Sequence, residues 1–388
     1  MNESTIHNGL DGIVAAETSL SMVDGTAGEL VIAGYPVAEL AMNASFEETA
    51  HLLWYGALPD EQELAAFRAD LARRRHLAPV AYDLLRAAAQ ERVDGMDALR
   101  MAAGTISLRG AASDDEAARD LLAAFPTIVA AYWRLLSDHE PIASRPDLGH
   151  AANFLHMLSG ETPSEERVRG LETYLNTVVD HGLNASTFTA RVIASTNSDL
   201  VSAITGAIGA LKGPLHGGAP GPALDMVFEI GTAARAEEVL RKKIEAGEKL
   251  MGFGHRVYKV RDPRPDVLAA ATERMFTRGG DMALYQLARA VEAVALRLLE
   301  EYKPGRNLQT NVEFYTALLL HGLDLEVPLF TPTFAVSRVA GWIAHCFEQR
   351  RLNRIIRPQS VYRGVRDRRW IPASARSAQP VSLPLVSP

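Results

Sequence analysis

The chain has 388 residues, of which 47% are hydrophobic and 22% are charged, and its formal net charge is −7. This length and composition are typical of a globular protein of two or three domains, and they exclude a chain dominated by disorder or fibrous repeats. The acidic balance argues against a wholly basic nucleic-acid binder, although a local basic patch remains compatible with it.

Neither the cysteine count nor the hydropathy pattern indicates export or membrane insertion. Cys346 is the only cysteine, which excludes an internal disulfide and a cysteine-based metal cluster and fits a reducing compartment. Residues 1–10 show no secretory signal. The longest uncharged apolar stretch, 121–133, is broken by Pro126 and is shorter than the roughly 20 residues that a membrane span needs. We therefore expect a cytoplasmic protein without a membrane segment.

Hydrophobic periodicity predicts a nearly all-α protein with a small β-hairpin near its N-terminus. The hairpin is expected from residues 19–23 and 29–33, which flank a turn containing Asp24 and Gly25. The Pro- and Ser-rich stretch 372–388 is expected to be a flexible tail. Apolar residues at helical spacing predict helices, in chain order, over residues 46–54, 60–75, 164–180, 198–211, 223–230, 236–246, 263–276, 281–301 and 331–349.

Two histidines lie in glycine-rich loops at expected helix boundaries. His216 lies in the run GPLHGG (213–218), and His255 lies in the run GFGHR (252–256). Glycines allow a ligand to approach the backbone, and a helix N-terminus lowers the pKa of a nearby histidine, which favours a neutral hydrogen-bond donor. One such histidine alone would fit a core or capping role. Two loops of this kind, with His181 three residues before Asn184, favour a functional site.

Glu313 is the only acidic residue between positions 307 and 322, and it begins an otherwise apolar helical segment. A carboxylate at that place either complements the helix dipole or serves as a general base. Both interpretations remain open from the residues alone.

Two stretches are basic within this acidic chain. Residues 252–264 hold four cations and one anion, which fits an anionic, phosphate-bearing ligand or an ordinary solvated face. Their Gly-x-Gly lacks the third glycine and the preceding strand of a dinucleotide-binding loop. Residues 349–370 hold eight arginines and one aspartate. Carboxylate binding or a subunit contact fits this stretch better than nucleic-acid binding, because it contains no recognisable nucleic-acid module.

Together these segments resemble the bacterial type of the citrate synthase family, from about Gly9 to about Gly364. The combination of GPLHGG and GFGHR is highly specific to that family. The resemblance implies an all-α, citrate-synthase-like fold. Residues 1–218 and 326–371 would form a large helical domain, and residues 219–325 would form a smaller inserted domain that closes over the substrates.

The resemblance also implies a reaction, in which oxaloacetate and acetyl-CoA condense to citryl-CoA, which is hydrolysed to citrate and CoA. Glu313 would remove a proton from the acetyl methyl group, His216 would stabilise the enol or enolate, and His255 would polarise and protonate the ketone. The implied oxaloacetate ligands are His181, Asn184, Arg264, Arg338 and Arg357, the last contributed across the interface of a homodimer. The implied CoA-binding residues are Gly252, Phe253, Gly254, Arg256 and Lys259. The CoA thioester is a substrate, and neither a metal nor a permanently bound cofactor is implied.

One position departs from the commonest family pattern, which reads Asn-Val-Asp where this chain has Asn311-Val312-Glu313. The additional methylene moves the carboxylate by about one bond length, and a misplacement of about 1 Å can cost about 100-fold in rate. A branch of the family also carries Glu there. Two alternatives stay open: a 2-methylcitrate synthase that uses propionyl-CoA, and a weakly active relative that binds CoA or oxaloacetate. The presence of all three histidines and all three arginines argues against the second.

Overall fold

The computed structural model describes residues 6–10, 12–217, 221–255 and 257–376. The chain divides into two compact units, one of residues 16–356 and the other of the two chain ends, up to residue 15 and from residue 357 onward. Among its described residues, the unit of the chain ends contains two single-turn 3-10 helices, η1 (Asn8–Leu10) and η5 (Ala373–Ala375), and is mostly exposed.

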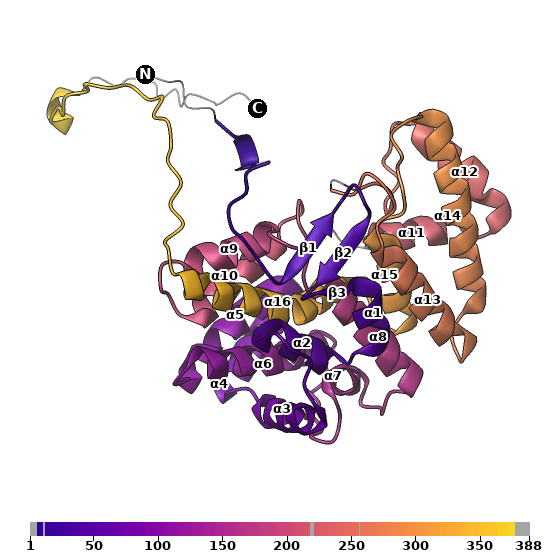
Figure 1. Ribbon diagram of the computed structural model, residues 1–388, viewed down its shortest axis with the longest axis horizontal. Helices are drawn as coiled ribbons and strands as arrows, with labels where there is room; N and C mark the ends of the chain where they lie inside the picture. Colours follow the sequence, from indigo (N-terminus) through magenta and orange to yellow (C-terminus); the bar gives the residue numbers. More distant parts are fainter. Residues whose placement is uncertain (1–5, 11, 218–220, 256, 377–388) are drawn as a thin grey trace. The chain divides into compact units, whose positions relative to one another are not determined.

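The unit of residues 16–356 is mainly helical, as the periodicity predicts (Figure 1). Every helix expected from the sequence is present. The α-helices are α1 (Val37–Asn43), α2 (Phe46–Tyr55), α3 (Glu61–Arg74), α4 (Pro79–Gln90), α5 (Gly95–Gly104), α6 (Asp114–Leu136), α7 (His150–Ser159), α8 (Glu165–Val178), α9 (Ala185–Ala194), α10 (Leu200–Leu211), α11 (Gly221–Ile230), α12 (Ala236–Glu245), α13 (Arg264–Thr277), α14 (Met282–Tyr302), α15 (Val312–Gly322) and α16 (Phe330–Leu352). The 3-10 helices are η2 (Thr105–Arg109), η3 (Ala233–Arg235) and η4 (Val327–Leu329).

Pro126 interrupts the apolar stretch of the sequence, but it does not end the helix in which it lies. It lies inside α6, which continues for 23 residues and buries nearly every side chain from Ala117 to Tyr132. None of the helices in the described residues combines the length and the apolar character needed to cross a membrane.

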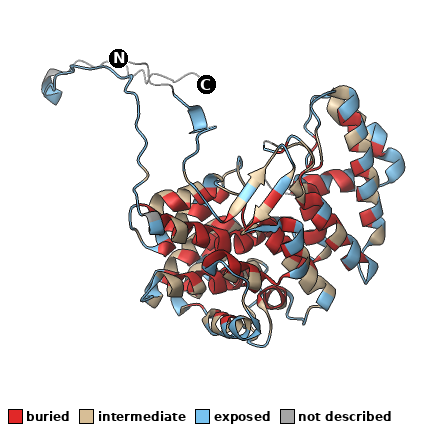
Figure 2. Ribbon diagram, in the orientation of Figure 1, coloured by how far each residue is buried: buried red, intermediate tan, exposed pale blue. Residues whose placement is uncertain are grey.

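The core of this unit is built around α16 and α6. Helix α16 packs against α2, α6, α8, α9 and α10, and Trp342, Ile343 and Cys346 are fully buried within it. Figure 2 shows the buried residues concentrated in these central helices. The helices α11 to α14 lie together at one flank, and α13 joins them to the rest by packing against α8 and α15.

The expected hairpin is present and carries a third short strand. β1 (Ser21–Asp24) pairs antiparallel with β2 (Glu29–Ile32), and β2 pairs with β3 (Tyr35–Pro36). Asp24 closes the turn, because its carboxylate accepts the backbone N–H groups of residues 26 and 27 at 2.8 Å.

The tip of the hairpin lies against the loop that follows His255. Gly25 accepts a backbone hydrogen bond from Lys259 at 2.8 Å. A Cβ atom at Gly25 would meet the Val257 carbonyl oxygen at 2.2 Å, so this close approach requires glycine. The hairpin therefore supports a loop more than 200 residues further along the chain.

Candidate active site

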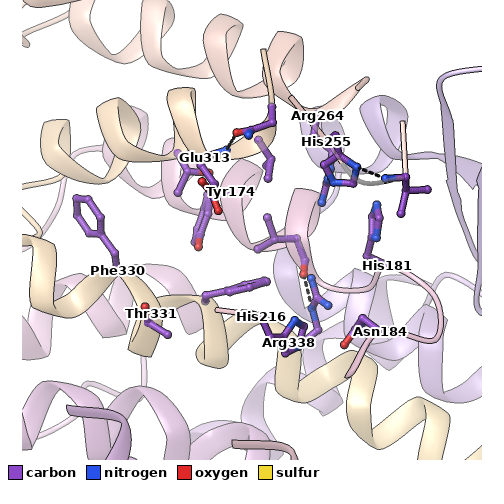
Figure 3. Close-up of a pocket in the computed structure, with 16 residues that line it drawn as sticks. Tyr174, His181, Asn184, His216, His255, Arg264, Glu313, Phe330, Thr331 and Arg338 are labelled. Atoms are coloured by element: carbon purple, nitrogen blue, oxygen red, sulfur yellow. Dashed lines mark hydrogen bonds between the residues drawn. The ribbon is translucent and has the colours of Figure 1, made fainter. Parts of the chain in front are cut away.

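One cavity of about 220 Å³ collects most of the site residues expected from the sequence. Its lining includes His181, Asn184, His216, His255, Arg264, Glu313 and Arg338, and aromatic and aliphatic side chains complete the wall. Figure 3 shows these polar groups around the cavity, with Glu313 and His255 on one side and His216 and Arg338 on the other. Arg357 belongs to the unit of the chain ends, and Arg256 lies outside the described residues.

His216 is held in one tautomer by α9. The backbone N–H of Ser186, in the first turn of α9, donates to His216 Nε2 at 3.2 Å. A backbone N–H can only donate, so Nε2 is the acceptor and the neutral ring carries its proton on Nδ1. The Ser186 hydroxyl lies 2.8 Å from the same Nε2 atom and accepts from Trp342 Nε1 at 3.0 Å. Nδ1–H is thus the donor left for a ligand.

Burial, followed by the Arg338 charge, lowers the pKa of His216 to about 4, so the ring is neutral at pH 7. The sequence analysis also predicts a neutral ring, but it attributes the lowered pKa to a helix N-terminus. His216 lies in the turn that follows the C-terminus of α10, where the helix dipole would favour the imidazolium. The cause is desolvation together with a nearby cation.

His255 is oriented in the opposite way. Its Nδ1 accepts the backbone N–H groups of Val257 and Tyr258 at 3.0 and 3.1 Å, which leaves the proton of the neutral ring on Nε2. Burial, followed by the Arg264 charge, lowers the pKa of His255 to about 4. Nε2 lies 3.3 Å from Arg264 Nη2, so two donors converge on one point. An oxygen atom of a ligand would satisfy both.

Glu313 and the His255 loop are joined by Asn311. The Asn311 side chain caps α15, because Oδ1 accepts the Glu313 N–H at 3.0 Å, while Nδ2 donates to the Gly254 carbonyl at 2.9 Å. Its backbone N–H donates to the Gly252 carbonyl at 2.9 Å. Gly252 has φ +85°, and a Cβ there would lie 2.9 Å from the Phe314 ring, so only glycine fits this junction.

Burial raises the pKa of Glu313 to about 7, against the opposing effect of the Arg264 guanidinium. The carboxylate has no hydrogen-bond or ion-pair partner among the described residues. A carboxyl group with a pKa near neutrality is suited to proton removal, because about half of it is ionised at pH 7 and the ionised form is a stronger base than an ordinary carboxylate.

Two buried arginines give the cavity a positive character. Arg264 is paired with Asp262, which accepts from its Nε at 3.0 Å and from its Nη2 at 2.8 Å. Arg338 Nε donates to the Val178 carbonyl at 2.8 Å, and its guanidinium lies over the Phe334 ring at 4.6 Å. Its terminal nitrogens have no hydrogen-bond or ion-pair partner in the described part of the chain. Burial, the largest influence, lowers the pKa of Arg338 to about 10, so it remains a cation at pH 7. An anionic ligand would compensate this buried charge.

His181 and Asn184 lie on the loop that leads into α9. His181 Nε2 lies 3.2 Å from the Tyr258 hydroxyl, and burial, then the charges of Arg264 and Arg338, lower its pKa well below the ordinary value. Asn184 is the N-cap of α9, since its Oδ1 accepts from the Thr187 N–H at 3.1 Å. Its amide is thus partly engaged in holding the helix that orients His216.

Of the expected CoA-binding residues, Lys259 lines a second cavity, whereas Gly252, Phe253 and Gly254 do not. This cavity, of about 220 Å³, is lined by Lys259, Tyr258, Arg306 and Asn307 among others, and it shares His255 with the first. Phe253 forms a β-bridge to Thr310 and packs against Phe314.

Several residues of the site were not anticipated from the sequence. Ser186, Trp342, Asp262 and Tyr258 orient the histidines or pair with Arg264. Asp262 lies in the basic stretch 252–264, two residues before Arg264, and Ser186 lies two residues after Asn184. Trp342 is far along the chain from His216, and no local pattern indicates their connection through Ser186. Within the described residues, no group of three or more His, Cys, Asp or Glu side chains is placed to hold a metal ion.

Comparisons with known proteins give consistent results over nearly the whole chain. The family described as "Citrate synthase, C-terminal domain" matches residues 9–359. A citrate synthase of Haloferax volcanii is 40% identical over 96% of this chain and 99% of its own length. A 2-methylcitrate synthase of Shewanella oneidensis is 40% identical over 95% of this chain and 97% of its own.

Two solved structures agree with this similarity. Citrate synthase of Pyrobaculum aerophilum superposes with a TM-score of 0.87 at 38% identity, covering 96% of this chain and 95% of that one. A ternary complex of the Thermoplasma acidophilum citrate synthase with carboxymethyl coenzyme A and oxaloacetate has a TM-score of 0.85 at 29% identity, covering 96% of this chain and all of that one.

Proposed function

The chain belongs to the citrate synthase family and is an acyltransferase of that type, and we propose that it performs this reaction with Glu313, His216 and His255. It condenses acetyl-CoA with oxaloacetate and hydrolyses citryl-CoA to citrate and CoA. The observation that carries the assignment of residues is the cavity in which a carboxyl group of pKa about 7 faces two neutral imidazoles with defined tautomers.

Proton removal and enolate stabilisation are assigned to opposite walls of the cavity. Glu313 removes a proton from the methyl group of the thioester. The His216 Nδ1–H donates to the thioester oxygen as negative charge develops there, and Ser186 prevents this proton from moving to Nε2. A preorganised donor of this kind stabilises the transition state more than water can, because it does not need to reorient.

The ketone of oxaloacetate is assigned to the point where His255 and Arg264 converge. His255 Nε2–H and Arg264 Nη2 lie 3.3 Å apart, so one carbonyl oxygen can accept from both. Attack of the enolate on the ketone carbon transfers negative charge to this oxygen, and His255 supplies the proton. Arg338, Arg264 and His181, with Asn184 nearby, hold the carboxylates of oxaloacetate.

Coenzyme A is assigned to the loop from Gly252 to Lys259 and the second cavity. The loop is joined to α15 through Asn311, and this connection supports a position of the thioester end next to Glu313. The exposed Lys259 and the nearby Arg306, with Arg256 in the same loop, suit the phosphates of CoA.

Closure of an inserted small domain over the substrates also belongs to this proposal. Residues 219–325 comprise a group of helices that pack on one another and connect to the rest through α13 and α15. The cavity draws on both sides of the proposed boundary, because His255, Arg264 and Glu313 come from the small domain and His181, His216 and Arg338 come from the large one. Closure would expel water and protect the thioester from premature hydrolysis.

A homodimer in the cytoplasm completes the proposal, with Arg357 completing the oxaloacetate site of the partner. Arg357 is followed by a largely exposed segment rich in arginine, which suits a contact with another subunit more than a place in the core. An arginine side chain can bind a carboxylate through two parallel hydrogen bonds.

The acyl group is the point at which a second candidate function arises. Relatives named 2-methylcitrate synthase are 40–41% identical to this chain, and relatives named citrate synthase are 38–40% identical. One methylene changes the discrimination between substrates by only about 1–3 kcal/mol.

Release of free thiol from a panel of acyl-CoA thioesters, with and without oxaloacetate, tests both candidates. A higher kcat/KM for acetyl-CoA than for propionyl-CoA supports citrate synthase, and the reverse order supports 2-methylcitrate synthase. Thiol release that does not depend on oxaloacetate would contradict both.

A further inference from the structure

A buried polar chain lies behind the cavity and connects β1, α9 and α16. Arg191 Nη1 lies 2.6 Å from Glu348 Oε2 and 3.1 Å from His345 Nδ1. His345 Nε2 in turn lies 3.2 Å from both carboxylate oxygens of Asp180, and the Ser21 hydroxyl donates to Asp180 Oδ2 at 2.5 Å. His345 and Asp180 are completely buried, so these contacts are not exchanged with water.

The direction of the hydrogen bonds follows from Arg191. An arginine can only donate, so His345 Nδ1 accepts from it and His345 Nε2 carries a proton that it donates to Asp180. The Asp180 carboxylate therefore receives one donor from α16 and one from β1. Glu348 balances the charge of Arg191.

Asp180 lies next to the groups proposed to bind oxaloacetate. It directly precedes His181 in the chain, and the Ser21 hydroxyl also accepts the Gly182 N–H at 2.9 Å. Arg338 is bound through Nε to Val178, two residues before Asp180. The charges of Asp180 and Arg338 influence each other, yet no ion pair joins these two described side chains.

We propose that His345 and Ser21 are positioning residues, which hold the Asp180 carboxylate away from Arg338 so that this guanidinium stays free for a substrate carboxylate. The proposal rests on the proposed function, because it assigns Arg338 to oxaloacetate. A carboxylate that pairs with Arg338 in the free enzyme competes with the substrate for the same donors. Loss of the restraint on Asp180 therefore raises the KM for oxaloacetate, whereas kcat and the KM for the CoA thioester change little.

Steady-state thiol release by the full-length enzyme tests this role. His345→Phe removes the donor to Asp180, and we expect the KM for oxaloacetate to rise about tenfold, the effect of losing one hydrogen bond to a buried charge. His345→Gln retains an amide donor on the Asp180 side and is expected to stay within about twofold of the parent. In His345→Phe combined with Asp180→Asn, the competing charge is absent, so the KM should fall back toward the parent value.

Two further variants keep the test decisive. Thr333→Val removes a buried hydroxyl of α16 whose hydrogen bond, in the described part of the chain, goes to the carbonyl of Leu329 at the end of η4, and it should leave the KM for oxaloacetate unchanged. Ser21→Ala removes the second donor to Asp180 from the edge of the small sheet. We expect it to raise that KM about threefold, even if His345→Phe does not fold.

The outcomes separate the two proposals. A parent enzyme without oxaloacetate-dependent thiol release overturns the proposed function, and the positioning role with it. An active parent overturns the positioning role alone if its His345→Phe or Ser21→Ala variant keeps the parent KM for oxaloacetate. The same holds if Asp180→Asn fails to lower the KM of His345→Phe, or if kcat falls in parallel with kcat/KM.

Discussion

Glu313 is the residue whose environment most directly sets the chemistry of the cavity. It lies in the first turn of α15, where a carboxylate could simply complement the helix dipole. Its partial burial, its raised pKa and its lack of a hydrogen-bond or ion-pair partner among the described residues distinguish it from an ordinary first-turn acid. Glu238 of α12 provides the comparison, since it occupies the same kind of position but is exposed.

We expect Glu313→Gln to lower kcat for condensation by about 1,000-fold, because the variant lacks the base while the shape of the site is retained. Binding of oxaloacetate, measured by calorimetry, should change little, since Arg264, Arg338 and His181 remain. Glu238→Gln is the matched control and should behave as the parent does. Near-normal turnover by Glu313→Gln would remove this residue from the mechanism.

The raised pKa of Glu313 also predicts how activity depends on pH. The base must be ionised, so kcat/KM should rise about tenfold per pH unit below pH 7 and level off above it. The acid limb should report an apparent pKa near 7. A limb centred near pH 4.5, the ordinary value for glutamate, would show that burial does not control this group.

Ionisation of Glu313, which activity requires, should lower the stability of the folded state. The pKa of Glu313 is about 7 in the folded chain against 4.5 for an ordinary glutamate, so the folded state holds its proton more tightly. The folded state therefore loses stability as pH rises from about 4.5 to 7, by at most about 3 kcal/mol. Glu313→Gln should be more stable than the parent at pH 8 and equally stable at pH 4, as denaturant melts can measure. Equal stability at both pH values would contradict this.

At the residue level, short sequence motifs mark side chains that come together in the folded chain. His216, His255, Glu313 and Arg264 belong to such motifs, and the structure brings them to one cavity. The groups that orient them come from distant parts of the chain. His345 bonds to Asp180 across 165 positions, and Trp342 bonds to Ser186 across 156. Only the folded chain reveals these pairs.

At the scale of elements, the N-terminal hairpin has a larger role than its size suggests. Its first strand supplies Ser21 to Asp180, next to His181, and its tip contacts the loop that follows His255. The hairpin therefore contacts the surroundings of His181 and of His255, which lie on opposite sides of the proposed domain boundary.

Gly25→Ala should displace the loop of His255, because the added methyl group would meet the Val257 carbonyl oxygen at 2.2 Å. We expect kcat/KM to fall about tenfold or more, since a shift of about 1 Å in a catalytic group can cost 100-fold. Gly104→Ala is the matched control, because nothing lies within 4 Å of a Cβ added there. Equal activity of the two variants would show that the tip does not support the site.

The helices differ in how well the sequence reveals them. Helices such as α14 and α3 have an exposed face, so their apolar residues form a visible stripe. Helix α6 is buried over most of its length and contains a proline, so periodicity does not mark it. Helices α7 and α9 have only ten residues each, and α7 is largely buried, so their periodicity is also hard to recognise. Helix α4 is absent from the expected helices although its buried residues Ala81, Leu85 and Ala88 recur at helical spacing. A third strand of two residues in the sheet was also beyond sequence patterns.

At the scale of the whole molecule, the proposed dimer can be tested through active sites that combine residues of both subunits. If Arg357 serves the partner's cavity, Arg357→Ala and Glu313→Gln should each be nearly inactive. In a mixed dimer of the two, one of the two sites has both groups intact. Subunits refolded together at equal amounts should therefore recover roughly one quarter of the parent activity. No recovery, or a species of 42.1 kDa in sedimentation, would contradict a shared site.

Cys346 gives the molecule an unusual analytical property. It is the only cysteine of the chain, it is fully buried in α16, and burial raises its pKa to about 12. The folded protein therefore offers no reactive sulfur at neutral pH, and a chromogenic disulfide reagent should count only the coenzyme that is set free. When α16 unfolds, Cys346 becomes accessible, and the reagent should then react with one additional thiol per chain. The same colorimetric thiol assay can therefore measure turnover and, when the protein is heated, the unfolding of α16, which carries Arg338.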